Sequence, residues 1–194
     1  MATAEVLERT TSTVCDDDAL YEVIDGLRVE LPPMSILAAR VATRIHDALH
    51  AYSQQHRKGE SVVETLLRMP HVPRQRRPDV AFVSYDRWPA DRPIDSDESA
   101  WDVVPDVAVE VVSPSDLAEG LLEKVLEYLR AGVRLVWVVY PRLQIIHAYE
   151  SPSKIREYSP SDDLDGGEVL PGFRRPVASL FPPMNVLPVT RDDS

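Results

Sequence analysis

The sequence has a single cysteine, no long apolar run and fewer basic than acidic residues. One thiol, Cys15, excludes an internal disulfide and a cysteine-clustered zinc site. No apolar stretch approaches the roughly 20 residues that cross a bilayer. The N-terminus also lacks the basic and apolar regions of a secretory signal. We therefore expect a cytoplasmic protein that is not embedded in a membrane.

The formal net charge of −11 argues against broad, nonspecific binding of nucleic acids. Affinity for phosphate groups needs an excess of Lys and Arg on at least one face of a protein. A local basic groove remains compatible with this charge. The sequence has one basic cluster, formed by Arg74, Arg76 and Arg77 with Arg68 nearby. These arginines are interpreted either as contacts with substrate phosphate or as part of a solvated connecting loop.

Length and composition are those of one soluble domain, which we place at residues 19–185. Residues 1–18 carry no consistent apolar period and end in three aspartates, so we expect a mobile leader there. Residues 186–194 are expected to form a C-terminal tail.

Hydrophobic periodicity predicts an α/β (α+β) fold, a mixed sheet flanked by helices with an N-terminal β-hairpin. The hairpin is expected at residues 21–31 around Asp25-Gly26. Helices are predicted at 35–55 and 116–131, the second with Leu117, Leu121, Val125 and Leu129 on its buried stripe. Strands are predicted at 61–69, 79–84, 106–112, 135–140, 144–149 and 154–158. Residues 70–78 are expected to form a loop, 87–101 an irregular loop able to act as a lid, and 162–167 a turn.

One acidic residue, Glu110, interrupts the apolar run VAVEVV. An ionised carboxylate in a buried strand is costly unless it is paired or binds a metal. Asp106 shares its face of the strand but lies about 13 Å away, too far for one metal ion. Neighbouring strands are about 4.8 Å apart, so Asp79 is the best-placed partner if the two strands pair. Two carboxylates suffice for a hard cation such as Mg²⁺, which keeps water and phosphate as further ligands.

The position of Lys124 follows from similar arithmetic. Returning from Ser113 to Glu110 covers about 10 Å of strand, and Asp116 to Lys124 covers about 12 Å of helix. If the helix folds back along the strand, the ammonium and the carboxylate are level. Lys124 would then orient the attacking water or neutralise charge on a phosphate. The alternative is a surface lysine paired with a neighbouring acid, namely Glu123, Glu127 or Glu110.

Six short motifs, in order, resemble the Uma-two family, which is described as restriction endonucleases within the PD-(D/E)XK nuclease superfamily. The resemblance runs from Tyr21 to Phe181. Its motifs are YEVIDG at 21–26, RPDVAFV at 77–83, PDVAVEVVSPS at 105–115, EKVLEYLRAGV at 123–133, VWVVYP at 136–141 and LPGF at 170–173.

The resemblance implies a restriction-endonuclease-like core in which Asp79 and Glu110 bind Mg²⁺ or Mn²⁺ and DNA is the substrate. The superfamily's usual lysine would stand two residues after Glu110, where this chain has Val112. Lys124 resembles a migrated replacement for that lysine. Superfamily members often add an earlier glutamate, for which Glu64 is a candidate.

One departure from the family concerns the first long helix. The family often shows a histidine near its start, where this chain has Ala38. The alternative function is therefore a scaffold or binding protein that keeps the nuclease fold but has lost activity. RNA rather than DNA is a further alternative substrate. A nuclease that cuts both strands of a duplex would benefit from two-fold symmetry, so we expect a homodimer.

Overall fold

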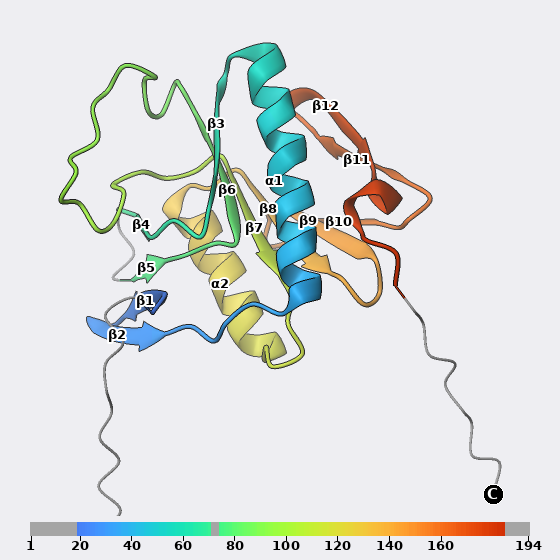
Figure 1. The fold of residues 1–194 in the computed structure, drawn as a ribbon, viewed down its shortest axis with the longest axis horizontal. Helices are drawn as coiled ribbons and strands as arrows, with labels where there is room; N and C mark the ends of the chain where they lie inside the picture. The colour runs from blue at the N-terminus through green and yellow to red at the C-terminus, as the bar shows by residue number, and fades with distance from the viewer. Residues whose placement is uncertain (1–18, 71–73, 185–194) are drawn as a thin grey trace, which may run out of the picture.

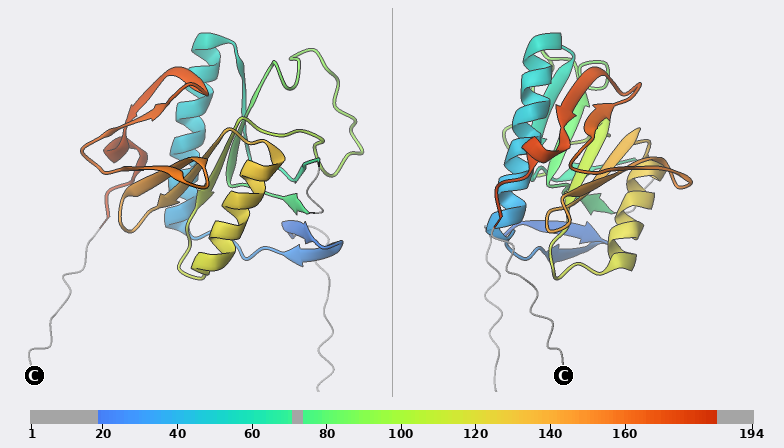
Figure 2. Two further views of the ribbon diagram at one scale, coloured as in Figure 1. Left: turned by 180° about the vertical axis from the view of Figure 1, so that it is seen from behind. Right: turned by 90° about the vertical axis from the view of Figure 1, so that its right-hand side faces the viewer.

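The computed structural model describes residues 19–70 and 74–184. Its centre is a six-stranded sheet with one long helix on each face (Figures 1 and 2). The strand order is β10-β9-β8-β7-β6-β3, and only the β7–β8 pair is parallel. The elements are β3 (Gly59–Val63), β6 (Val80–Ser84), β7 (Val107–Val111), β8 (Leu135–Tyr140), β9 (Ile145–Ser151), β10 (Lys154–Tyr158), α1 (Ile36–His56) and α2 (Ala118–Ala131). The predicted mixed sheet flanked by helices is confirmed.

Alternating side chains divide the core into two layers. On β7, Val107, Val109 and Val111 pack with α1, whereas Ala108 packs with α2. Both faces of the strand are therefore covered, which explains its nearly continuous apolar sequence. Glu110 falls on the same face as Ala108, because strand side chains alternate with a period of two.

Helix α1 begins where Ser35 caps it, because the Ser35 hydroxyl accepts a hydrogen bond from the Ala38 N–H at 3.2 Å. Its buried stripe includes Val41, Ile45 and Leu49, as the periodicity predicts. Ala38 is itself 1% exposed and belongs to the core between α1 and the sheet. A larger side chain at this position would have to displace core atoms.

A second, four-stranded sheet with the order β2-β1-β5-β4 lies beside the main one. Its strands are β1 (Tyr21–Ile24), β2 (Leu27–Glu30), β4 (Leu67–Arg68) and β5 (Gln75–Arg76). Asp25 and Gly26, with φ of 52° and 82°, form the tight turn between β1 and β2. The predicted hairpin is confirmed, and Figure 1 shows it next to the N-terminal half of α2.

Two predictions between the first helix and β6 were wrong. The strand predicted at 61–69 ends at Val63, because Glu64 takes a left-handed conformation with φ of 42° and turns the chain into the smaller sheet. The loop predicted at 70–78 contains β5, whose Gln75 lies opposite Val23 of the hairpin. The arginine cluster thus belongs partly to a strand rather than to a solvated loop.

Three further differences lie in the second half of the chain. Helix α2 begins at Ala118, and Leu117, predicted to be buried, is the N-cap residue and is 79% exposed. The turn predicted at 162–167 is instead part of the hairpin formed by β11 (Asp163–Gly166) and β12 (Leu170–Pro176). A short 3-10 helix, η1 (Val177–Leu180), follows and packs with α1.

No helix in residues 19–70 and 74–184 is long and apolar enough to cross a membrane. The predicted leader 1–18 with Cys15, and the tail 186–194, lie outside the described residues.

Candidate active site

Asp79 and Glu110 are brought together by the antiparallel pairing of β6 and β7. Val80 lies opposite Val109, so Asp79 and Glu110 are the next positions along the pair. The Asp79 carboxylate caps the strand end, because its Oδ2 accepts a hydrogen bond from the Val111 N–H at 2.5 Å. The pairing assumed in placing Asp79 next to Glu110 is the one that the structure has.

Glu110 is held on the α2 face of the sheet and is 6% exposed. The Tyr128 hydroxyl donates a hydrogen bond to Glu110 Oε1 at 2.7 Å. The Lys124 ammonium lies 3.5 Å from Glu110 Oε2. Lys124 and Tyr128 are four residues apart on α2 and therefore project from one side of the helix. The helix folds back along β7 as the distance arithmetic predicts.

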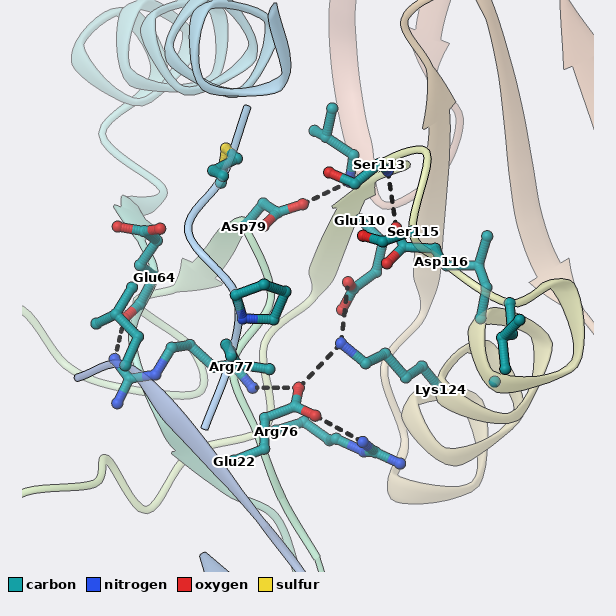
Figure 3. Close-up of a pocket in the computed structure, with 18 of the residues that line it drawn as sticks. Glu22, Glu64, Arg76, Arg77, Asp79, Glu110, Ser113, Ser115, Asp116 and Lys124 are labelled. Atoms are coloured by element: carbon teal, nitrogen blue, oxygen red, sulfur yellow. Dashed lines mark hydrogen bonds and ion pairs between the residues drawn. The ribbon is translucent and has the colours of Figure 1, made fainter. Parts of the chain in front are cut away.

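A second carboxylate, Glu22 of β1, also contacts Lys124, with Oε1 3.1 Å from Nζ. Glu22 is 1% exposed, and Arg76 lies 2.7 Å from its other oxygen. Neither Glu22 nor Tyr128 was predicted as a site residue from the sequence. In Figure 3 Lys124 lies between Glu110 and Glu22, and Arg76 is joined to the other oxygen of Glu22.

The arginines predicted to contact substrate phosphate are engaged within the protein. Arg76 bridges two buried acids, and Arg74 lies 2.5 Å from Glu127 Oε1. Arg77 donates to the backbone carbonyls of Tyr21 and Glu64. Arg74 and Arg76 therefore act as counter-charges inside the fold in this structure. Arg77 contacts only neutral groups among these partners and lines the pocket described next.

A pocket of about 500 Å³ opens over these side chains. Asp79, Glu110 and Lys124 lie along its floor (Figure 3). Its walls are largely apolar and come from the residue before β1, the segment between β2 and α1, and the start of α2, namely Leu20, Leu31, Pro32, Pro33, Met34, Leu117 and Leu121. No residue of the loop 87–101 lines this pocket, so that loop is not a lid over it in this structure.

Burial perturbs the acids of the site. Desolvation, together with the neighbouring charge of Glu110, raises the pKa of Asp79 to about 8. Desolvation also raises the pKa of Glu110, although Lys124 opposes this. Burial alone would lower the pKa of Lys124, but the carboxylates of Glu110 and Glu22 raise it above its ordinary value. The lysine is therefore held as a cation.

A network of ion pairs surrounds the pocket. Three buried acids, Glu22, Glu110 and Glu127, pair in it with Lys124, Arg76 and Arg74, and Arg74 also pairs with the exposed acids Asp25 and Glu123. The acids of the network therefore outnumber its bases. Asp79 is a further carboxylate, which adds negative charge when it ionises. Carboxylate oxygens in excess at a pocket floor suit a hard divalent cation.

The remaining predicted acid, Glu64, lines the same pocket but stands across it from Glu110 in Figure 3. In residues 19–70 and 74–184 no group of three or more His, Cys, Asp or Glu side chains is placed to hold a metal ion. Ala38 packs in the core and does not line the pocket.

Comparisons with known proteins bear on this arrangement. A family model described as Uma2, "Putative restriction endonuclease", matches residues 8–178. The chain belongs to the Uma2 family. A search of curated proteins finds no match.

Among solved structures, the Uma2 chain is similar to one titled "putative nuclease belonging to DUF820" from Anabaena variabilis ATCC 29413. The TM-score is 0.72 at 16% sequence identity, and the match covers 83% of this chain and 89% of that one. At this identity the likeness shows a shared fold.

The Uma2 membership agrees with the resemblance found in the sequence motifs. Glu22 lies within the first of those motifs, YEVIDG, and is the buried residue of β1. The alternating pattern of the hairpin gives no sign of this burial, because a polar residue between Tyr21 and Val23 is expected on the exposed face. The partners of Glu22 were not evident either, because Arg76 and Lys124 lie far along the chain.

Proposed function

We propose that this Uma2 protein is a divalent-metal-dependent nuclease that hydrolyses phosphodiester bonds in DNA. Asp79 and Glu110 would hold Mg²⁺ or Mn²⁺, and Lys124 would contact the phosphate. The observation that carries the proposal is the convergence of these three side chains on the floor of one open pocket, in a fold of the nuclease family.

The chemistry follows from the charges at the pocket floor. A metal held by the two carboxylates would polarise the phosphate and lower the pKa of a bound water molecule. Lys124 keeps its proton because two carboxylates surround its ammonium, so it does not act as a base. It donates to a phosphate oxygen and neutralises the charge that develops there. Arg77, at the pocket wall, is the arginine best placed for a second phosphate contact.

The test is hydrolysis of plasmid DNA by the purified protein with Mg²⁺ or Mn²⁺. Cleavage should disappear with EDTA and in the Glu110→Ala variant. Asp163→Ala, which alters an exposed carboxylate of the β11–β12 hairpin, is the matched control and should cleave normally. Equal cleavage by Glu110→Ala and the unaltered protein would refute the assigned site.

The alternative, a nuclease fold without activity, makes a different prediction for metal binding. Calorimetric titration with Mn²⁺ should show binding that is lost in Asp79→Asn if the site is functional. A scaffold protein would show no binding that depends on Asp79. Parallel assays with RNA of the same sequence test the choice of substrate.

The predicted cytoplasmic location and homodimer belong to the same proposal. A dimer would place two sites on the two strands of a duplex. Light scattering of the purified protein gives its mass in solution, and a monomer with full activity on both strands would contradict the predicted dimer.

A further inference from the structure

We propose that Glu22 is a positioning residue that holds the Lys124 ammonium beside Glu110. This inference rests on the proposed nuclease function. It assigns a role at the pocket to the N-terminal hairpin, which stands outside the six-stranded sheet that carries Asp79 and Glu110.

The contacts of Glu22 engage both oxygens of its carboxylate. Oε1 lies 3.1 Å from Lys124 Nζ and accepts a hydrogen bond from the Arg77 N–H at 3.2 Å. Oε2 accepts a hydrogen bond from Arg76 Nη1 at 2.7 Å. A carboxylate with three donors around it has little capacity left for a metal ion. Glu22 therefore acts on the site through Lys124 rather than as a metal ligand.

Lys124 needs this second partner because its contact with Glu110 is the longer of the two, 3.5 Å against 3.1 Å for Glu22. A lysine side chain has several rotatable bonds and loses much conformational freedom when it is fixed. Its side chain is 23% exposed, so water at the pocket mouth competes for the ammonium. The carboxylates of Glu110 and Glu22, one on each side, confine the ammonium to the space beside the phosphate.

Arg76 in turn fixes Glu22. Its Nε donates to Glu127 Oε2 at 2.7 Å, while its Nη1 binds Glu22. Arg76 comes from β5 and Glu127 from α2, so one guanidinium ties the hairpin, the smaller sheet and the helix together. An arginine suits this position because its planar fork binds two carboxylates in a fixed geometry.

The experiment measures hydrolysis of bis(p-nitrophenyl) phosphate with Mn²⁺, which needs no knowledge of the preferred DNA sequence. Glu22→Gln should lower kcat about 10- to 100-fold, as removal of an outer partner commonly does. KM and the Mn²⁺ affinity measured by calorimetry should stay unchanged, because Asp79 and Glu110 are intact. Glu150→Gln, an exposed carboxylate paired with Lys154, is the matched control and should keep full kcat.

A double variant, Glu22→Gln with Arg76→Gln, separates positioning from stability. It removes one acid and one base together, so the net charge of the network is unchanged, and Glu127 keeps Arg74 as its partner. Its melting temperature should therefore exceed that of Glu22→Gln alone. Its kcat, corrected for the folded fraction by circular dichroism, should remain as low as that of Glu22→Gln.

Recovery of kcat in the double variant would overturn the positioning role and leave Glu22 a purely structural acid. Loss of Mn²⁺ affinity in Glu22→Gln would overturn it too, because Glu22 would then be a metal ligand. If the unaltered protein hydrolyses neither this diester nor plasmid DNA, the proposed function fails and the positioning role falls with it. An active unaltered protein with an equally active Glu22→Gln refutes the positioning role alone.

Discussion

Asp79→Asn should stabilise the metal-free protein at alkaline pH while abolishing its activity. The pKa of Asp79 in the folded protein is about 8, against 3.8 for an unperturbed aspartate. Because the folded state holds the proton more tightly, the favourable contribution of Asp79 is complete below about pH 4 and is lost as the pH rises to about 8. Above that pH the folded protein contains an ionised carboxylate that is poorly solvated and faces Glu110.

The size of the effect follows from the two pKa values. The two pKa values differ by about four, and each pKa unit corresponds to about 1.4 kcal/mol, so ionisation of Asp79 can destabilise the folded protein by at most about 6 kcal/mol. Asp79 lines an open pocket, and water there screens its charge. We therefore expect Asp79→Asn to raise the free energy of unfolding by about 1–3 kcal/mol at pH 8.5. Asparagine keeps an oxygen that can accept the Val111 N–H, so the cap on β7 is retained.

The assay is urea unfolding in the presence of EDTA at several pH values between 5.5 and 8.5. This range lies above the isoelectric point of about 4.9. The difference in unfolding free energy between the variant and the unaltered protein should grow steadily with pH, since the other titratable groups are present in both proteins. A difference that does not change with pH, or an unaltered protein that is the more stable at pH 8.5, would refute the reasoning. Asp163→Asn at an exposed position is the control and should show no such trend.

Three further predictions concern the same network. If Asp79 must ionise before it binds a metal, Mn²⁺ binding at pH 7 should release close to one proton, which calorimetry in buffers of different ionisation heat measures. The affinity for Mn²⁺ should then fall about tenfold for each pH unit below 8. Tyr128→Phe removes a buried donor to Glu110 and should cost about 1–3 kcal/mol of unfolding free energy, and a neutral result in urea unfolding would contradict it. Arg76→Met leaves two buried carboxylates without their bridge and should cost about 3–5 kcal/mol. Arg174→Met at an exposed ion pair should change the same measurement by less than about 0.5 kcal/mol.

The sequence was most informative where a local rule applied. Glu110 stood out because an acid within an apolar strand needs a partner, and the fixed strand spacing then selected Asp79 over Asp106. Asp106 instead lies 3.0 Å from Arg87, at the other end of the strand. The fixed rise of the helix placed Lys124 level with Glu110. These steps use distances that hardly vary between proteins.

The sequence was least informative where contacts join distant segments. Arg74 and Arg76 were predicted to be phosphate ligands because adjacent arginines indicate a basic surface, but their carboxylate partners lie about 50 residues away along the chain. The strand break at Glu64 depends on a left-handed backbone conformation that a non-glycine residue rarely adopts. The β11–β12 hairpin was missed because Asp163-Leu164-Asp165 shows a single apolar residue between two acids.

The internal pairing of the arginines bears on how an acidic protein could act on a polyanion, as we propose. Arg74 and Arg76 compensate buried acids, and Lys124 is shared by two carboxylates, so these cations give the pocket no net positive charge. Asp79 adds negative charge whenever it ionises. Under the proposed function, a phosphate group would be repelled until a divalent cation occupied the carboxylates, because that ion would reverse the local charge. Substrate binding as well as hydrolysis would then depend on the metal, and the overall net charge of −11 would limit attachment to DNA elsewhere on the surface.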